Sequence, residues 1–284
     1  MTNTHSKNET HLNANSIDKL TVVSSFFPIG EFVSKVGGGI IDSSLLVPIG
    51  VEPHDFEPTI KQLQAVNSAD VLVYNGLGIE NWIKKIDIPK IDASKDLNAS
   101  YTDKRNISLD PHIWLDPLRA KEEVRNIRDG LAKINPSNKQ DYFDNAKIFS
   151  MDLDKLDSKI RTELADCKKR DFISFHNSFS YFAKRYGLNQ HSISGSGPQM
   201  EFTPTRLAEI IDLAKNLDLH IIYSEELVDP RYASVIAEEI PNGKVLPLSP
   251  IEGLTKKEQN DGVSYIDKMN ENIKNLMAGL ECNK

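Results

Sequence analysis

The sequence is poor in cysteine, in long apolar runs and in positive charge, and each shortage excludes a class of protein. Two cysteines in 284 residues, Cys167 and Cys282, are too few for a disulfide-built scaffold and have no CxxC spacing, so a single bridge and two free thiols both remain open. No apolar run reaches the roughly 20 residues of a membrane-spanning helix. Because 34 Lys and Arg face 41 Asp and Glu, we expect a soluble protein with no nucleic-acid surface.

The common sequence motifs of nucleotide-binding and hydrolytic enzymes are also absent. The chain has no GxGxxG before a helix, no GxxxxGK[ST], no GxSxG and no HExxH, which excludes the usual phosphate loops, serine-hydrolase turns and helical zinc-protease sites. Residues 1–18 are polar and lack the apolar segment of a signal peptide. We expect a disordered tail or tether there, in a protein that is either cytoplasmic or has lost a leader.

From residue 19 onward, short β-rich runs alternate with helical patterns. This order predicts an α/β fold in which parallel sheets are flanked by helices. We place an N-terminal lobe at 19–137 and a C-terminal lobe at 168–284. The predicted strands are 20–27, 44–49, 71–74, 86–92 (weakened by Pro89), 172–175, 191–194, 219–223 and 245–248.

The segment 138–167 predicts one long helix between the lobes. No Gly or Pro interrupts 138–166, and apolar residues recur there at steps of three and four, which predicts a helix of about 29 residues and about 43 Å. Elsewhere, Pro58 fits the first turn of a helix, and Thr203 fits an N-cap before Pro204. A final amphipathic helix is predicted at 265–280.

Three histidines are candidate ligands, and the strand pattern places two of them where a ligand site is expected. His54 follows the predicted strand 44–49, His176 directly follows 172–175, and His112 lies in a loop framed by prolines. Ligands of parallel sheets bind beyond the carboxyl ends of the strands. Imidazoles are common zinc ligands and a carboxylate can complete the tetrahedron. Glu252, after the predicted strand 245–248, offers that carboxylate.

Structural roles fit the same residues. His54 can begin a turn, His176 can cap the next helix, and Glu252 can be an exposed loop carboxylate. His191 and His220 are expected to be structural, because each lies within or beside a predicted strand.

Four segments in a fixed order carry a resemblance to a known family. They are PHDFEP (53–58), DPHIWLDP (110–117), FHNSF (175–179) and LSPIEGLT (248–255). With them the chain resembles the metal-binding solute-binding proteins of ABC importers, in particular the zinc-uptake substrate-binding family. The resemblance implies two α/β lobes joined by one long rigid helix, with a metal site in the cleft between the lobes.

The resemblance also implies a ligand set of His54, His112, His176 and a carboxylate. Manganese-binding members typically carry Glu at the third position, so His176 indicates zinc. Many members have Asp where this chain has Ser249, whereas a zinc-type subgroup uses a Glu that aligns with Glu252. We expect Glu252 to be the fourth ligand. Candidates for holding the histidine rings, by proximity alone, are Asp55, Glu57, Asp110 and Asp116.

The function implied is extracytoplasmic capture of Zn²⁺ and its delivery to an ABC-type membrane permease. A monomer without enzymatic activity is expected, in the periplasm or at the cell surface, anchored through a leader or lipid that this sequence does not contain. The His-rich loop of many zinc members is missing from 92–109. The alternatives are a manganese or iron carrier of the same family and a zinc hydrolase in which Glu252 acts as the general base.

Overall fold

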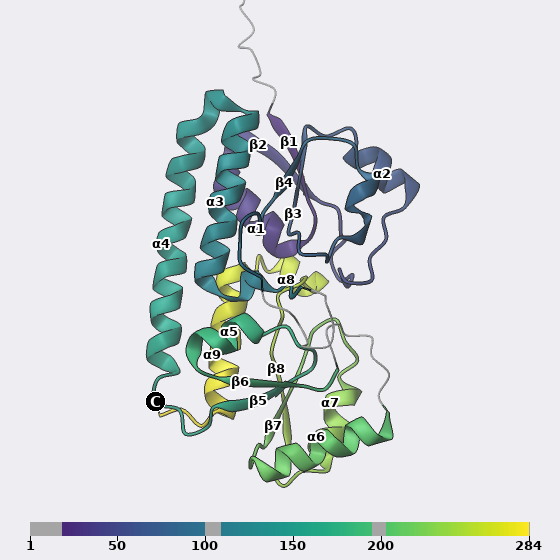
Figure 1. Ribbon diagram of the computed structural model, residues 1–284, viewed down its shortest axis with the longest axis vertical. Coiled ribbons are helices and arrows are strands. Elements are labelled where there is room, and N and C mark those ends of the chain that lie inside the picture. Colours follow the sequence, from purple (N-terminus) through teal and green to yellow (C-terminus); the bar gives the residue numbers. More distant parts are fainter. Residues whose placement is uncertain (1–18, 100–108, 195–202, 284) are drawn as a thin grey trace, which may run out of the picture.

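The computed structural model describes residues 19–99, 109–194 and 203–283. It contains two four-stranded parallel sheets flanked by helices, with two long helices lying along one side of the molecule (Figure 1). This confirms the predicted α/β class with two lobes and a long helix. The prediction of a disordered tail at 1–18 lies outside the described residues. In the described part of the chain, no helix combines the length and the apolar character needed to cross a membrane.

The first sheet has the order β2-β1-β3-β4, and all its strands are parallel. The apolar run of β3 is buried, as expected for a parallel sheet covered on both faces. The first two helices of this lobe are α1 (Phe27–Gly37) and α2 (Ile60–Val66). The strands are β1 (Leu20–Ser24), β2 (Ile41–Leu45), β3 (Val71–Tyr74) and β4 (Lys90–Asp92).

Four predictions in this lobe were wrong in detail. The strand predicted at 20–27 ends at Ser24, before α1, and the one predicted at 86–92 begins only at Lys90, after Pro89. The strand predicted at 44–49 lies earlier, at β2, because pairing with β1 starts at Ile41; the apolar Leu46 and Val47 are buried in the loop that follows. Pro58 lies outside α2 rather than in its first turn. Thr59 caps that helix instead, since its side chain accepts a hydrogen bond from the backbone of Gln62.

The second sheet repeats the plan, with all strands parallel in the order β6-β5-β7-β8. Its strands lie within two residues of the predicted ranges. The predicted cap is confirmed: the Thr203 side chain accepts from the backbone of Arg206, with Pro204 in the first turn. The strands are β5 (Asp171–Ser174), β6 (Asn189–Ser192), β7 (Ile221–Ser224) and β8 (Lys244–Pro247), and the helices are α5 (Ser180–Tyr186), α6 (Pro204–Asn216) and α7 (Arg231–Glu238).

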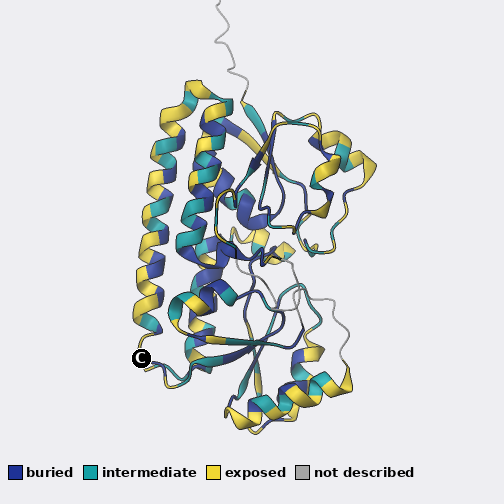
Figure 2. Cartoon of the chain, in the orientation of Figure 1, coloured by how far each residue is buried: buried dark blue, intermediate teal, exposed yellow. Residues whose placement is uncertain are grey.

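The long helix is α4 (Lys139–Glu163), which lies beside α3 (Pro117–Ile134). Its 25 residues give about 37 Å. It ends three residues before the predicted end. The Arg170 guanidinium donates hydrogen bonds to the carbonyls of Leu164 and Ala165, which follow the last turn. The buried side of α4 faces the core and its outer side is exposed (Figure 2).

One apolar core runs through both lobes. It joins side chains of both sheets to α3, α4 and the C-terminal helix α9 (Tyr265–Gly279); the short α8 (Lys256–Asn260) precedes α9. The exact boundaries at 137 and 168 therefore stay a prediction. Cys167 and Cys282 form a disulfide, which ties the chain after α4 to the chain after α9 and decides between the two alternatives left by the sequence.

Candidate metal centre

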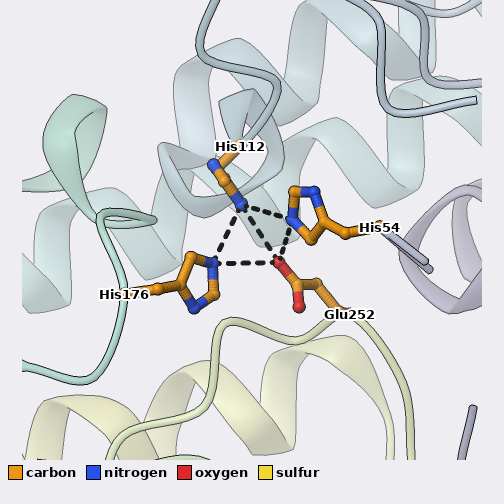
Figure 3. Close-up of side chains that lie close together, drawn as sticks. All are labelled: His54, His112, His176 and Glu252. Carbon is orange, nitrogen blue, oxygen red and sulfur yellow. Dashed lines mark hydrogen bonds and ion pairs between the residues drawn. The ribbon is translucent and has the colours of Figure 1, made fainter. Parts of the chain in front are cut away.

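Four side chains that are remote in sequence meet between the two lobes: His54, His112, His176 and Glu252 (Figure 3). Their ligand atoms all lie within 4.8 Å of one another. The Nε2 atom of His112 is 3.2 Å from that of His54 and 3.1 Å from that of His176. Glu252 Oε1 lies 3.1, 3.0 and 3.3 Å from the Nε2 atoms of His54, His112 and His176.

These separations match the edges of a small tetrahedron. A tetrahedral ion with bonds of about 2.0 Å has ligand atoms about 3.3 Å apart. The three imidazoles point their Nε2 atoms at the common centre, and Glu252 supplies the fourth corner (Figure 3). Among the described residues this is the one group of three or more His, Cys, Asp or Glu side chains with such spacing. The arrangement can chelate a single divalent cation.

The two sheets place three of these residues by the same rule. His176 follows β5 directly, Glu252 lies in the loop after β8, and His54 lies in the loop between β2 and α2. All three loops leave the carboxyl ends of parallel strands, where the sheets face each other. His112 comes from a different kind of segment, the turn that enters the 3₁₀ helix Ile113–Leu115.

The buried histidines are each held from behind by a carboxylate. Asp110 Oδ1 accepts from His112 Nδ1 at 2.7 Å and from its backbone N–H at 3.1 Å. Both oxygens of Glu225 lie 2.8 Å from His176 Nδ1, and Oε1 also accepts from the His176 backbone at 3.1 Å. A proton held on Nδ1 leaves the Nε2 lone pair for a cation. The ring orientations are therefore fixed before any ion arrives.

Of the four residues predicted to hold the rings, only Asp110 does so. Glu57 forms an ion pair with Lys85 at the surface. Asp116 caps α3 by accepting from Leu118 N, and no contact between Asp55 and a ring is present in the described part of the chain. Proximity in sequence misled here because Glu57 and Asp116 find other partners, Lys85 and the start of α3, instead of a histidine ring.

Sequence reasoning missed Glu225. It follows β7, the strand beside β5, so its carboxylate reaches His176 at the same edge of the sheet. The strand-end rule that selected His176 would also have selected Glu225, had it been applied to every acidic residue after a strand.

Burial and neighbouring carboxylates shift the pKa values of the buried imidazoles in opposite directions. Burial alone would lower the pKa of His112, but hydrogen bonds to Asp110 and Glu252 outweigh it and raise that pKa. For His176 burial is again outweighed, here by the charges of Glu225 and Glu252, and its pKa lies well above the usual value. Protons therefore compete with a cation for these Nε2 atoms.

The pKa values of two carboxylates at the site are also shifted, but in different directions. Burial would raise the pKa of Glu252, yet the charges of His176 and His54 hold it well below its usual range. Glu52, whose Oε1 accepts from His54 N at 3.1 Å, behaves differently. Burial, followed by the charge of Glu252, raises the pKa of Glu52 to about 9. Glu52 therefore keeps its proton at neutral pH, whereas Glu252 is ionised and offers its negative charge to a cation.

The remaining candidates lie outside the cluster. The Ser249 hydroxyl donates to Glu226, so it is turned away from the histidines. His191 Nε2 lies 2.8 Å from Asp171 Oδ1, and His220 Nδ1 donates to the carbonyl of Pro241 at 2.8 Å. Both histidines make the structural contacts that were expected of them.

Comparisons with known proteins find relatives that are named for zinc uptake or zinc binding. The model of the family described as "Zinc-uptake complex component A periplasmic" (ZnuA) matches residues 22–279. The "High-affinity zinc uptake system protein ZnuA" of Bacillus subtilis (strain 168) is 36% identical over an alignment of 282 residues, covering 93% of this chain and 88% of that protein.

Two further matches involve Streptococcus pneumoniae. The "Zinc-binding lipoprotein AdcA" of strain ATCC BAA-255 / R6 is 32% identical over 277 residues and covers 91% of this chain, which spans only 55% of that protein. The solved structure of the Zn(II)-bound ZnuA-like domain of AdcA superposes with a TM-score of 0.82 at 32% identity. It covers 93% of this chain and 99% of that chain.

Proposed function

Because this chain belongs to the zinc-uptake complex component A family, we propose that it captures Zn²⁺ outside the cytoplasmic membrane and delivers it to an ABC-type permease. His54, His112, His176 and Glu252 are the proposed ligands. The B. subtilis and S. pneumoniae relatives are named for zinc uptake and zinc binding, which supports the choice of metal. Zinc here is the cargo of the protein rather than a resident cofactor.

The observation that carries this proposal is the tetrahedral spacing of three nitrogen atoms and one oxygen atom. Zn²⁺ prefers four-coordinate sites built from imidazole and carboxylate, whereas Mn²⁺ prefers more oxygen ligands. Zinc also exceeds manganese and iron(II) in general affinity for such donors. The third imidazole, His176, therefore favours zinc over the manganese and iron alternatives.

The same geometry favours capture over hydrolysis. A catalytic zinc site has three protein ligands and keeps its fourth position open for water. Here Glu252 Oε1 lies within 3.3 Å of all three Nε2 atoms and fills the fourth corner. A general base would instead lie beside an open position.

We extend the proposal to a monomer attached to the membrane surface. The S. pneumoniae relative is named a lipoprotein, which supports a lipid anchor joined on the N-terminal side of the first lobe. Fractionation of cells that express the complete gene product tests the attachment, because an anchored protein sediments with membranes and is released by detergent. Recovery of the complete product in the cytosol would contradict the location.

Competitive metal titration of the purified protein tests the metal and the ligands together. We expect one Zn²⁺ per chain, displacement of bound Mn²⁺ or Fe²⁺ by Zn²⁺, and anomalous scattering at the zinc edge centred among the four side chains. His191→Ala is the matched control, because it removes a carboxylate-paired histidine outside the cluster. Tighter binding of Mn²⁺ than of Zn²⁺ would replace the zinc proposal with the manganese alternative.

A further inference from the structure

The backbone just before Glu252 is held by side chains from distant elements. The side chain of Asn272, on α9, accepts a hydrogen bond from the Ser249 N–H at 2.8 Å. Its amide nitrogen donates a hydrogen bond to the Ser249 carbonyl at 2.7 Å. The indole N–H of Trp114 donates to the Pro250 carbonyl at 2.8 Å. Each of these backbone groups is therefore fixed from outside the loop.

The next residue, Ile251, has an unusual backbone. Its φ is +59°, and it is the only β-branched residue with a left-handed φ among the described residues. This region is unfavourable for β-branched side chains and persists only where neighbouring contacts enforce it. The Ile251 side chain is fully buried, and its N–H donates to the Ser249 hydroxyl at 3.0 Å.

The Ser249 hydroxyl is itself held in place. It donates to Glu226 Oε1, and Lys268 Nζ lies 3.4 Å from the same oxygen and 2.6 Å from Glu258 Oε1. Lys268 is only 4% exposed, so this ionic network is centred on a buried ammonium group. The hydroxyl thus links the network to the backbone of Ile251, which directly precedes Glu252.

We propose that Ser249 is a positioning residue that aims Glu252 at the histidine cluster by enforcing the left-handed conformation of Ile251. This deepens the proposed function and rests on it. A change of φ at Ile251 would rotate the next peptide and move the Glu252 carboxylate away from the three Nε2 atoms. Without the hydroxyl, zinc has to reorder that backbone when it binds, which weakens affinity.

The test compares Ser249→Ala with Tyr223→Phe. Each removes one buried hydroxyl; that of Tyr223 donates its hydrogen bond to the Asn275 carbonyl on α9 at 2.9 Å rather than to residues 249–252. Zinc Kd is measured by competition with a chelating dye, and folding by the thermal transition of the metal-free protein. Ser249→Thr, which retains the hydroxyl, is the rescue variant.

We expect Ser249→Ala to raise the zinc Kd about 10-fold or more, within the range seen when groups that support metal ligands are removed. Tyr223→Phe should lower the thermal transition without changing Kd, and Ser249→Thr should bind zinc nearly as tightly as the parent. A parental Kd for Ser249→Ala, or equal losses of affinity in Ser249→Ala and Tyr223→Phe, would overturn the inference. Failure of the parent to bind zinc would instead overturn the proposed function.

Discussion

The two sides of the histidine cluster are built differently. His112 and His176 are fully buried, and each donates its Nδ1 proton to a carboxylate. The His54 side chain is 16% exposed, and within the described residues the hydrogen bonds and ring contacts of its imidazole go to members of the cluster. The first two rings are rigid because their surroundings fix them, while the third is oriented mainly by its loop and by the partners it meets.

The difference indicates how the binding free energy is distributed. A ring whose tautomer and orientation are already set loses little entropy when it binds a cation, whereas a less restrained ring must be ordered at that moment. A truncated buried ring also leaves a cavity lined by charged groups, while a truncated exposed ring is replaced by water. The buried pair should therefore contribute more to zinc affinity than His54.

The largest effect is expected for His112→Ala. At free zinc one hundred times the parental Kd, the parent gains about 2.7 kcal/mol of stability from binding. The variant should lose most of this gain, because one of four ligands and the partner of Asp110 are both removed. Thermal unfolding with and without zinc measures it, and His191→Ala should respond as the parent does. An unchanged shift would remove His112 from the site.

His54→Ala should weaken zinc binding less than His112→Ala. Water can enter at the partly exposed position and act as the fourth ligand, so residual binding by His112, His176 and Glu252 is expected. Titration of both variants under identical conditions compares their Kd values directly. Equal losses of zinc affinity in the two variants would show that a ring held by a carboxylate contributes no more to binding than His54 does.

The sequence predicted this site where simple geometric rules apply. His176 and Glu252 were found because they follow strands of parallel sheets. Outside the site, the helix cap Thr203 was found because a capping residue precedes a proline. His112 lies in an irregular turn, so only the resemblance to a family located it. Glu225 was missed because the strand-end rule was not applied to every acidic residue, and its pairing with His176 depends in addition on the sheet order, which a single sequence does not give.

Two other features could not be predicted from the sequence, again because they depend on contacts between distant segments. The pairing of Cys167 with Cys282 spans 115 residues, and it depends on how α4 and α9 end side by side. The left-handed Ile251 is contrary to its local preference and is imposed by distant contacts. In both cases tertiary structure, rather than local pattern, sets the outcome.

A smaller loss is expected for Glu225→Gln, which keeps the shape but removes the charge behind His176. Zinc Kd near pH 8 should rise by about 10-fold to 100-fold, since the imidazole becomes a weaker and less oriented ligand. Asp171→Asn is the matched control, because Asp171 supports His191 outside the cluster. A parental Kd in Glu225→Gln would mean that burial alone orients His176.

Glu225→Gln should also shift the pH dependence of zinc affinity, moving the loss of affinity in acid to lower pH. In the parent, zinc affinity falls as acid protonates His176, and because Glu225 raises the pKa of His176, this loss begins above the ordinary imidazole value of about 6.5. Removing the charge lowers that pKa, so the acid limb of the affinity profile should move to lower pH. Titrations between pH 5 and 9 measure the shift, and an acid limb that stays in place would assign the titration to another group.

The smallest effect on zinc binding is expected from the paired substitutions Cys167→Ser and Cys282→Ser. The disulfide closes a long loop and lies at the end of α4 beside the C-terminus (Figure 1), so its loss should reduce the free energy of unfolding by about 2–4 kcal/mol. Zinc Kd should stay at the parental value, because none of the contacts to Asp110, Glu225 or Ser249 involves either cysteine. Denaturant unfolding and dye competition measure the two quantities on one sample. If Kd rose as much as in Glu225→Gln, the rigidity of the buried histidines would be a property of the whole lobe rather than of the carboxylates that hold them.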